Sequence, residues 1–306
     1  MSSNHIVLEA VPNVSEGRDE PCIAACGRAL GAHGCSVLDV HSDADHNRSV
    51  FTLVGGPQEL ADSLLAAART VVEHVDMRAH EGAHPCIGAL DVVPIAYLRK
   101  DDRELAHDEA LAVANRLAAE LDLPVFVYGE LASADHRRER AFFRDGGVNA
   151  LSARMASGEL APDFGPPRMH PTAGAALVAA RPPLVAFNIE LGTDDVDVAK
   201  QIAANVREAG GGLPGVRAIG VKLATRGVAQ VSTNVQDPFT VPLGEVVEAV
   251  RREAGALGTT IGAAELVGLA PGPALDGFPG DVELRGFDER RHILENRVPR
   301  VAARHV

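Results

Sequence analysis

The sequence has few cysteines and no apolar run long enough to cross a membrane. Four cysteines among 306 residues are too few for a disulfide scaffold, so we expect reduced thiols. The most apolar run, residues 173–180, ends at Arg181 and two prolines, whereas a membrane span needs about 20 residues. The N-terminus lacks the cationic start and apolar stretch of a secretion signal. We therefore expect a cytoplasmic protein with no membrane partner.

Positive charge is also scarce. The formal net charge is −13, which argues against a nucleic-acid partner because phosphate recognition needs a concentrated cationic face. An anionic substrate would need local positive charge, for which the scattered candidates are Arg48, Arg78, Arg168 and Lys222. Each of these side chains is equally typical of a solvated surface. The hydrophobic content of 46% is sufficient for a large core, in one large domain or two compact ones.

Hydrophobic periodicity predicts two series of strands and helices. The first is strand 6–11, helix 19–32, strands 37–40 and 49–54, helix 57–75 and strand 90–97, followed by helix 102–121 and strand 125–128. The second is strand 184–189, helix 194–209, strands 216–223 and 228–233, helix 243–257 and strand 259–267. Because the order of elements repeats, we predict two similar α/β (α+β) subdomains, residues 1–182 and 183–306.

Other parts of the pattern limit this prediction. Residues 137–168 are charged and then rich in proline and glycine, so we expect the least regular structure there. A doubly wound nucleotide-binding fold is disfavoured because no first strand leads into a G-x-G-x-x-G helix start.

Residues 80–84, His-Glu-Gly-Ala-His, match the zinc-protease pattern H-E-x-x-H. That chemistry needs both histidines on one helix face, with the glutamate activating a zinc-bound water. Gly82 inside the motif and Pro85 after it disfavour a helix, and no third ligand stands out downstream. We therefore expect no metal. Taken alone, this segment favours two hydrogen-bonded structural histidines.

A longer segment around these histidines is more informative. Residues 76–94, Asp-Met-Arg-Ala-His-Glu-Gly-Ala-His-Pro-Cys-Ile-Gly-Ala-Leu-Asp-Val-Val-Pro, resemble the glutamate formiminotransferase family. Further segments resemble that family in order along the chain: Val-Pro-Asn-Val-Ser-Glu-Gly at 11–17, Asn-Arg-Ser-Val-Phe-Thr at 47–52, residues 124–130, Ala-Pro-Asp-Phe-Gly-Pro at 161–166, Ala-Phe-Asn-Ile at 186–189, Ala-Gln-Val-Ser-Thr-Asn at 229–234 and Glu-Leu-Val-Gly-Leu at 265–269. Such an ordered series is far more specific than any one short motif.

The resemblance implies a transferase that moves the formimino group of N-formiminoglutamate to N5 of tetrahydrofolate, in histidine degradation and one-carbon metabolism. It implies N-terminal and C-terminal formiminotransferase subdomains whose mixed sheets face one another across a substrate groove, with helices outside. It also implies a homodimer and tetrahydrofolate as co-substrate. We expect the single-domain form, without the cyclodeaminase domain that is fused to the vertebrate enzyme.

The same resemblance assigns residues. The family's catalytic histidine corresponds to His84, which would act as an acid/base catalyst. Its folate segment corresponds to Gly165, Pro166, Pro167, Arg168, Met169, His170, Pro171, Thr172, Ala173 and Gly174. The glycines there permit close backbone approach, the prolines limit the entropy lost on binding, and Arg168 could meet an anionic folate tail. A plain interdomain linker is the alternative.

Substrate contacts are less specifically indicated. Asn47 and Arg48 are candidates for holding the substrate carboxylates, because arginine can bind a carboxylate through two parallel hydrogen bonds. Asp91, or a carboxylate of the acidic loop at Asp43 and Asp45, is a candidate for orienting the imidazole.

Departures from the family pattern leave the donor open. Cys86 stands where many relatives have arginine, and His41 replaces an acidic residue of the vertebrate pattern. Arg48 and Arg78 are candidates for restoring the missing positive charge. The alternatives are a folate-dependent transferase for another formimino or formyl donor, a non-catalytic folate-binding relative, and an H-E-x-x-H zinc hydrolase.

Overall fold

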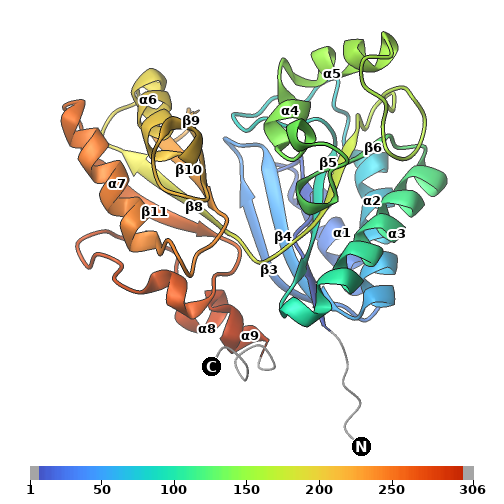
Figure 1. The fold of residues 1–306 in the computed structure, drawn as a ribbon, viewed down its shortest axis with the longest axis horizontal. Helices are drawn as coiled ribbons and strands as arrows, with labels where there is room; N and C mark the ends of the chain where they lie inside the picture. The colour runs from blue at the N-terminus through green and yellow to red at the C-terminus, as the bar shows by residue number, and fades with distance from the viewer. Residues whose placement is uncertain (1–6, 299–306) are drawn as a thin grey trace, which may run out of the picture. The chain divides into compact units, whose positions relative to one another are not determined.

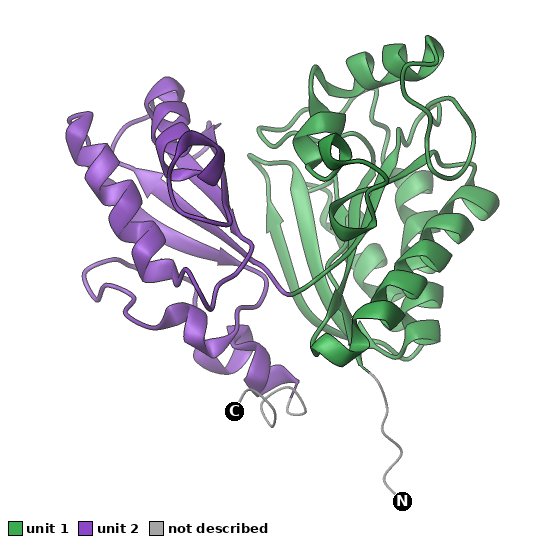
Figure 2. Ribbon diagram, viewed as in Figure 1, with its two compact units in different colours: residues 1–182 green, residues 183–306 purple. Residues whose placement is uncertain are grey.

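The computed structural model describes residues 7–298, and the chain divides into two compact units, residues 1–182 and 183–306 (Figure 2). Each unit is built on one mixed β-sheet with helices packed against it. The predicted mixed α/β architecture with two subdomains is therefore confirmed. Among the helices of residues 7–298, none is long and apolar enough to cross a membrane.

Unit 1 contains a seven-stranded sheet within the described residues (Figure 1). Its strands are β1 (Leu8–Ala10), β2 (Asn13–Val14), β3 (Ser36–Asp43), β4 (Arg48–Gly55), β5 (Leu90–Tyr97), β6 (Val125–Val127) and β7 (Ala176–Arg181). β4 pairs with β3 on one side and with β1 and β2 on the other, so β1 and β2 are two parts of one interrupted strand. β5 lies next, antiparallel to both parts, and continues in parallel to β7 and then β6.

Three helices pack on one face of this sheet: α1 (Glu20–Gly31), α2 (Pro57–His74) and α3 (Arg103–Leu121). α1 begins where the Asp19 carboxylate accepts a hydrogen bond from the Cys22 amide at 3.2 Å. Phe51 and Leu53 of β4 lie in the core beneath these helices. Because side chains alternate along a strand, Arg48 of β4 lies on the opposite face.

That opposite face carries two short helices, α4 (Arg140–Arg144) and α5 (Gly147–Ala156). They pack over the β5, β6 and β7 end of the sheet through a second apolar cluster that includes Phe143, Leu151, Phe126 and Leu177. The polar side chains described below lie on this face.

Unit 2 contains a five-stranded sheet, again within the described residues. Its strands are β8 (Val185–Leu191), β9 (Val216–Leu223), β10 (Val228–Val235), β11 (Ile261–Val267) and β12 (Leu284–Arg285), and its helices are α6 (Val196–Val206), α7 (Leu243–Ala256), α8 (Glu289–His292) and α9 (Leu294–Arg297). Short 3₁₀ turns at 100–102, 129–131, 135–137, 208–210 and 272–275 complete the two units. α6 and α7 supply one side of the unit 2 core.

The two sheets have corresponding strand orders. In unit 1 the order is β3, β4, β1 with β2, β5 and β7, and in unit 2 it is β9, β10, β8, β11 and β12. In both, the last of these pairings is parallel and the others are antiparallel. The common strand order agrees with the two similar subdomains that the repeated order of elements predicted.

The pattern missed several elements. Residues 137–168, which we expected to be irregular, contain α4 and α5. The apolar run 173–180, which is too short for a membrane span, contains most of β7, a strand paired on both edges. Its residues are almost all fully buried, so it has no polar alternation to mark it as a strand.

Candidate active site around His84

His84 lies in the non-helical connection between α2 and β5. α2 ends at His74 and β5 begins at Leu90, and no helix occurs between them, where every residue is described. The helix on which the zinc-protease motif depends is therefore missing. His80 and His84 instead have separate partners: His80 Nδ1 lies 3.3 Å from Asn47 Nδ2, and His84 Nδ1 lies 2.9 Å from the Pro85 carbonyl oxygen.

The connection is held against the loop between β3 and β4. The Ala83 amide donates to the Asp45 carbonyl at 2.9 Å, and Asn47 Nδ2 donates to the Glu81 carbonyl at 3.0 Å. Gly82 sits so close to this loop that an added Cβ would lie 2.3 Å from the His46 carbonyl oxygen. Glycine is therefore required at this close approach, and the fit fixes His84 relative to the β3–β4 loop.

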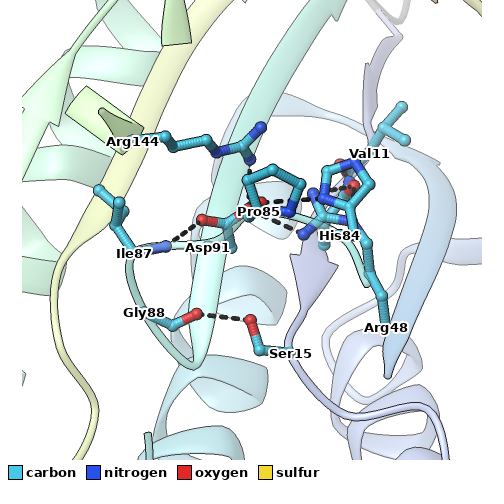
Figure 3. Close-up of polar contacts among 10 residues, drawn as sticks. Val11, Ser15, Arg48, His84, Pro85, Ile87, Gly88, Asp91 and Arg144 are labelled. Carbon is cyan, nitrogen blue, oxygen red and sulfur yellow. Dashed lines mark hydrogen bonds and ion pairs between the residues drawn. The ribbon is translucent and has the colours of Figure 1, made fainter. Parts of the chain in front are cut away.

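The hydrogen bond to Pro85 defines the neutral tautomer of His84. A carbonyl oxygen can only accept, so the proton must lie on Nδ1 of the imidazole. The unprotonated nitrogen is then Nε2, whose lone pair can take a proton from a reacting group. Figure 3 shows the imidazole beside Pro85 and Arg48, with Arg144 on the other side of Asp91.

Asp91 is the centre of a buried ionic cluster beside His84 (Figure 3). Arg48 Nη1 donates to Asp91 Oδ2 at 2.8 Å, and Arg144 Nη2 donates to the same oxygen. The other oxygen, Oδ1, accepts from the Ile87 amide at 2.9 Å. The Asp91 side chain is fully buried, whereas 11% of the Arg144 side chain is exposed. Asp91 therefore binds two arginines and does not orient the imidazole, a role that the Pro85 carbonyl fills.

The surroundings keep His84 neutral. Burial lowers the pKa of His84 well below its ordinary value, and the positive charges of Arg48 and Arg144 and the nearby His46 lower it further, against the opposing hydrogen bond to Pro85. The His46 and His84 ring centroids are 5.8 Å apart. A neutral imidazole at pH 7 is ready to accept a proton.

Asn47 and Arg48, the sequence candidates for substrate carboxylates, have extensive partners within the protein. Asn47 adopts a left-handed φ of 46°, and its Oδ1 accepts from the Gly17 amide at 3.0 Å. Arg48 donates from Nε and Nη2 to Asn13 Oδ1 at 3.0 and 2.7 Å, in addition to its bond with Asp91. These contacts favour positioning roles for both side chains.

Arg144 is the cation of this site that the sequence did not indicate. It lies in the region predicted to be irregular, and only the packing of α4 brings it to Asp91. Arg78, by contrast, forms an ion pair with Asp76, and its side chain is 70% exposed. Cys86 is partly buried near Asp91, Arg48 and Arg144, and burial raises the pKa of its thiol. Positive charge beside Cys86 is thus supplied by Arg48 and Arg144.

The predicted folate segment, residues 165–174, is brought next to the His84 connection at its C-terminal end. The Met77 amide donates to the Thr172 carbonyl and the Ala89 amide to the Ala173 carbonyl, each at 2.8 Å. At Gly174, an added Cβ would lie 2.4 Å from the Ile87 carbonyl oxygen.

Two polar side chains in this segment have different surroundings. Arg168 forms an ion pair with Asp122 in which both side chains are more than half exposed, so the site does not bring it together with His84. His170 Nδ1 accepts from the Ala173 amide at 2.9 Å, which leaves the proton on Nε2. Burial lowers the pKa of His170, so this ring also favours the neutral form.

Similarity to known proteins covers both units. Residues 7–181 match the family described as the formiminotransferase domain, N-terminal subdomain, and residues 186–276 match the formiminotransferase domain. The chain belongs to the formiminotransferase family. This membership agrees with the resemblance found from the sequence segments.

The chain matches some relatives in the formiminotransferase family over nearly their whole length and others over about half of it. The glutamate formimidoyltransferase of Streptococcus pyogenes serotype M1 is 37% identical, over 95% of this chain and 98% of that protein. The glutamate formimidoyltransferase of Thermoplasma acidophilum is 34% identical, over 97% and 98% respectively. The formimidoyltransferase-cyclodeaminase of Gallus gallus is 41% identical over 88% of this chain, which spans 51% of that protein.

Proposed function

We propose that this protein transfers the formimino group of N-formiminoglutamate to N5 of tetrahydrofolate, with His84 as the acid/base catalyst. The observation that carries the proposal is the state of His84. Its Nδ1 proton is held by the Pro85 carbonyl, and the cationic surroundings disfavour the imidazolium form. Family membership and the two glutamate formimidoyltransferases that match nearly the whole chain support the same reaction.

The proposed steps need one proton carrier. N5 attacks the formimino carbon, a new C–N bond forms, and the C=N electrons move to the imino nitrogen of a tetrahedral intermediate. His84 Nε2 takes the N5 proton and returns it to the glutamate nitrogen, whose bond to carbon breaks as the C=N bond re-forms. A positioned acid/base group of this kind contributes about 10²–10⁴-fold to the rate. No oxidant, covalent nucleophile or metal is required.

Residues 165–174 are the proposed folate segment, and tetrahydrofolate is the proposed co-substrate. The hydrogen bonds of Thr172 and Ala173 to the His84 connection support this assignment, because they allow a ligand on the segment to reach the imidazole. The ion pair between Arg168 and Asp122 would have to open if Arg168 is to bind the folate tail. We further propose a cytoplasmic homodimer in histidine degradation and one-carbon metabolism.

An assay with tetrahydrofolate and several donors tests the proposal. We expect transfer from N-formiminoglutamate in excess EDTA, and weaker or no transfer from N-formylglutamate and formiminoglycine. Product from another donor alone would identify a different formimino or formyl transferase. Loss of activity in EDTA, restored by zinc, would contradict the mechanism.

Amide hydrogen exchange tests the folate segment separately. A tetrahydrofolate analogue should slow exchange in residues 165–174 and around His84, because binding reduces local opening. Protection confined to another surface would show that the folate segment is wrongly assigned.

A further inference from the structure

α4 presents two arginines on the face of the sheet that carries His84. Arg140 and Arg144 are one helical turn apart, so their side chains lie on the same face of the helix. Phe143, between them, is fully buried against Phe126 of β6, with ring centroids 5.1 Å apart. This contact anchors α4 to the sheet and fixes where the two guanidinium groups lie.

Arg140 differs from the other arginines of this region in its partners. Arg137 is paired with Asp163 and Arg154 with Glu159. Within residues 7–298, the Arg140 guanidinium forms no ion pair and no side-chain hydrogen bond. Its Cζ lies 6.0 Å from the Tyr128 ring centroid, at the outer limit of a cation–π contact. It is nevertheless only partly exposed. A partly buried cation without an anionic partner is costly for the fold.

Arg144 is only partly satisfied. Its Nη2 donates to Asp91, but its Nε is buried without a hydrogen-bond partner in the described chain. Figure 3 shows another nitrogen of this guanidinium pointing away from Asp91. Asp91 also accepts hydrogen bonds from Arg48 and the Ile87 amide. Its single negative charge is therefore shared between two arginines and cannot neutralise both. Burial, and to a lesser extent the charge of Arg144, lower the pKa of Arg140, although Tyr128, Asp91 and Glu139 oppose the shift.

The carboxylates near Arg140 and Arg144 do not balance the positive charge of the two arginines. Asp91 is the acidic side chain that contacts Arg144, and it is shared with Arg48. Glu139, next to Arg140 in the sequence, is exposed. Three arginines therefore face one buried carboxylate beside His84, and an anionic ligand would restore the balance.

We propose that Arg140 and Arg144 form a carboxylate-binding site that holds the glutamate part of the formimino donor. This inference rests on the proposed function and adds the residues that select the donor. Two guanidinium groups match a dicarboxylate, because arginine binds carboxylates through charge-assisted hydrogen bonds. Arg48 then need not contact the substrate. Its hydrogen bonds to Asn13 and Asp91 position the Asp91 carboxylate, which in turn positions Arg144.

Calorimetric titration of the purified protein with L-glutamate and L-glutamine, in the presence of a tetrahydrofolate analogue, tests the site without requiring turnover. The wild type should prefer L-glutamate. Arg140→Gln and Arg144→Gln should each weaken L-glutamate binding about ten- to a hundredfold, the range for loss of a charged hydrogen bond. Arg78→Gln is the control, because Arg78 is exposed and paired with Asp76, and it should bind like the wild type.

Steady-state kinetics and unfolding measurements distinguish donor binding by Arg140 and Arg144 from folate binding and from a purely structural role. Both variants should raise KM for N-formiminoglutamate by a similar factor while KM for tetrahydrofolate stays within about threefold. Arg140→Gln should also raise the urea midpoint of unfolding, since it removes an unpaired cation. If Arg140 served only to stabilise the fold, the substitution would lower that midpoint. Arg144→Lys keeps the positive charge beside Asp91 and can therefore be tested even if Arg144→Gln does not fold. It should bind L-glutamate with an affinity between those of the wild type and Arg144→Gln.

The outcomes distinguish this site from the reaction itself. If both variants bind L-glutamate within threefold of the wild type, or if KM rises for tetrahydrofolate instead, the carboxylate site is wrong even though transfer continues. If the wild type transfers nothing but its L-glutamate binding depends on both arginines, the site stands and the proposed reaction fails.

Discussion

Arg48 and Arg144 donate hydrogen bonds to the same oxygen, Oδ2 of Asp91. One residue begins β4 and the other ends α4, so this shared acceptor ties the first hairpin to the helix on the same face of the sheet. The carboxylate is fully buried, which makes the cluster both a support for the fold and the source of positive charge beside His84.

Asp91→Asn should strongly destabilise the protein. Removing one partner of a buried ionic cluster typically costs about 3–5 kcal/mol, because the remaining charges stay buried. Burial alone would raise the pKa of Asp91, but Arg144 and Arg48 together bring it below its ordinary value. The stability that it contributes is therefore present above the pKa of an unfolded aspartate and is lost as the pH falls through the lower folded value.

Urea unfolding at several pH values measures this effect. The gap between wild type and Asp91→Asn should be largest at neutral pH and should narrow in acid. Asp76→Asn is the matched control, because its ion pair with Arg78 is exposed and exposed ion pairs contribute little to stability. Equal effects of the two substitutions would contradict the role given to Asp91.

Glu9 provides a second stability test with the opposite pH dependence. It lies on β1 directly across from Ala96, which in turn pairs with Arg181, so the three share one cross-strand row. Burial raises the pKa of Glu9 to about 7, although Arg181 opposes the shift. A carboxyl group whose pKa is higher in the folded state than in the unfolded state favours folding while it is protonated. That contribution is complete below the unfolded pKa and is lost as the pH rises through the folded pKa.

Glu9→Gln should therefore gain stability relative to the wild type above pH 7. At 1.36 kcal/mol for each unit of pKa, the relative gain between acid and pH 8.5 is about 3 kcal/mol. Glu104→Gln, at a side chain that is 82% exposed, should show no such trend. A constant offset between Glu9→Gln and wild type at all pH values would refute the buried-carboxyl explanation.

The pKa of His84 can be measured directly by NMR titration of the imidazole. We expect a midpoint below the ordinary value of about 6.5 in the free protein, because burial and nearby cations disfavour the charged ring. Arg144→Gln removes one of those cations, so the midpoint should move to higher pH. An unchanged or lower midpoint in this variant would show that Arg144 does not act on His84.

Gly82→Ala should disrupt the site without unfolding the chain. The new Cβ would collide with the His46 carbonyl oxygen at 2.3 Å, so the His84 connection must separate from the β3–β4 loop. We expect at least a tenfold loss of turnover, since a displacement of about 1 Å at an active site can cost 10²-fold. Gly280→Ala, where an added Cβ meets nothing within 4 Å, should keep wild-type activity; similar losses in both variants would contradict this explanation.

Most helices and strands were predicted from the sequence, because apolar periodicity and helix-start residues lie within the element that they mark. Helix 57–75 has one apolar stripe and a proline at its start, and α2 spans Pro57–His74. Strand 90–97 was predicted with its observed bounds. β7 was missed because a strand buried on both faces lacks alternation, and alanine-rich segments do not distinguish strand from helix by composition.

The site was only partly predictable for a different reason. Gly82 and Pro85 correctly indicated that the two histidines are not on a helix. The partners of Arg48 and Asp91 depend on residues distant in sequence, and the approach of Arg144 depends on α4, which had no periodic signal. Charge clusters assembled from separate elements become visible only when the packing is known.

Formation of 5-formiminotetrahydrofolate by wild type, His84→Ala and His80→Ala is the most direct test of the central claim. His84→Ala should lower kcat by about 10²–10⁴-fold while folate affinity stays within a few-fold, because a proton carrier acts mainly on the transition state. His80→Ala should lose much less, since His80 lies beside Asn47 and outside the proposed proton path. Turnover by His84→Ala within tenfold of wild type, or equal inactivity of both variants with loss of bound zinc, would contradict the account.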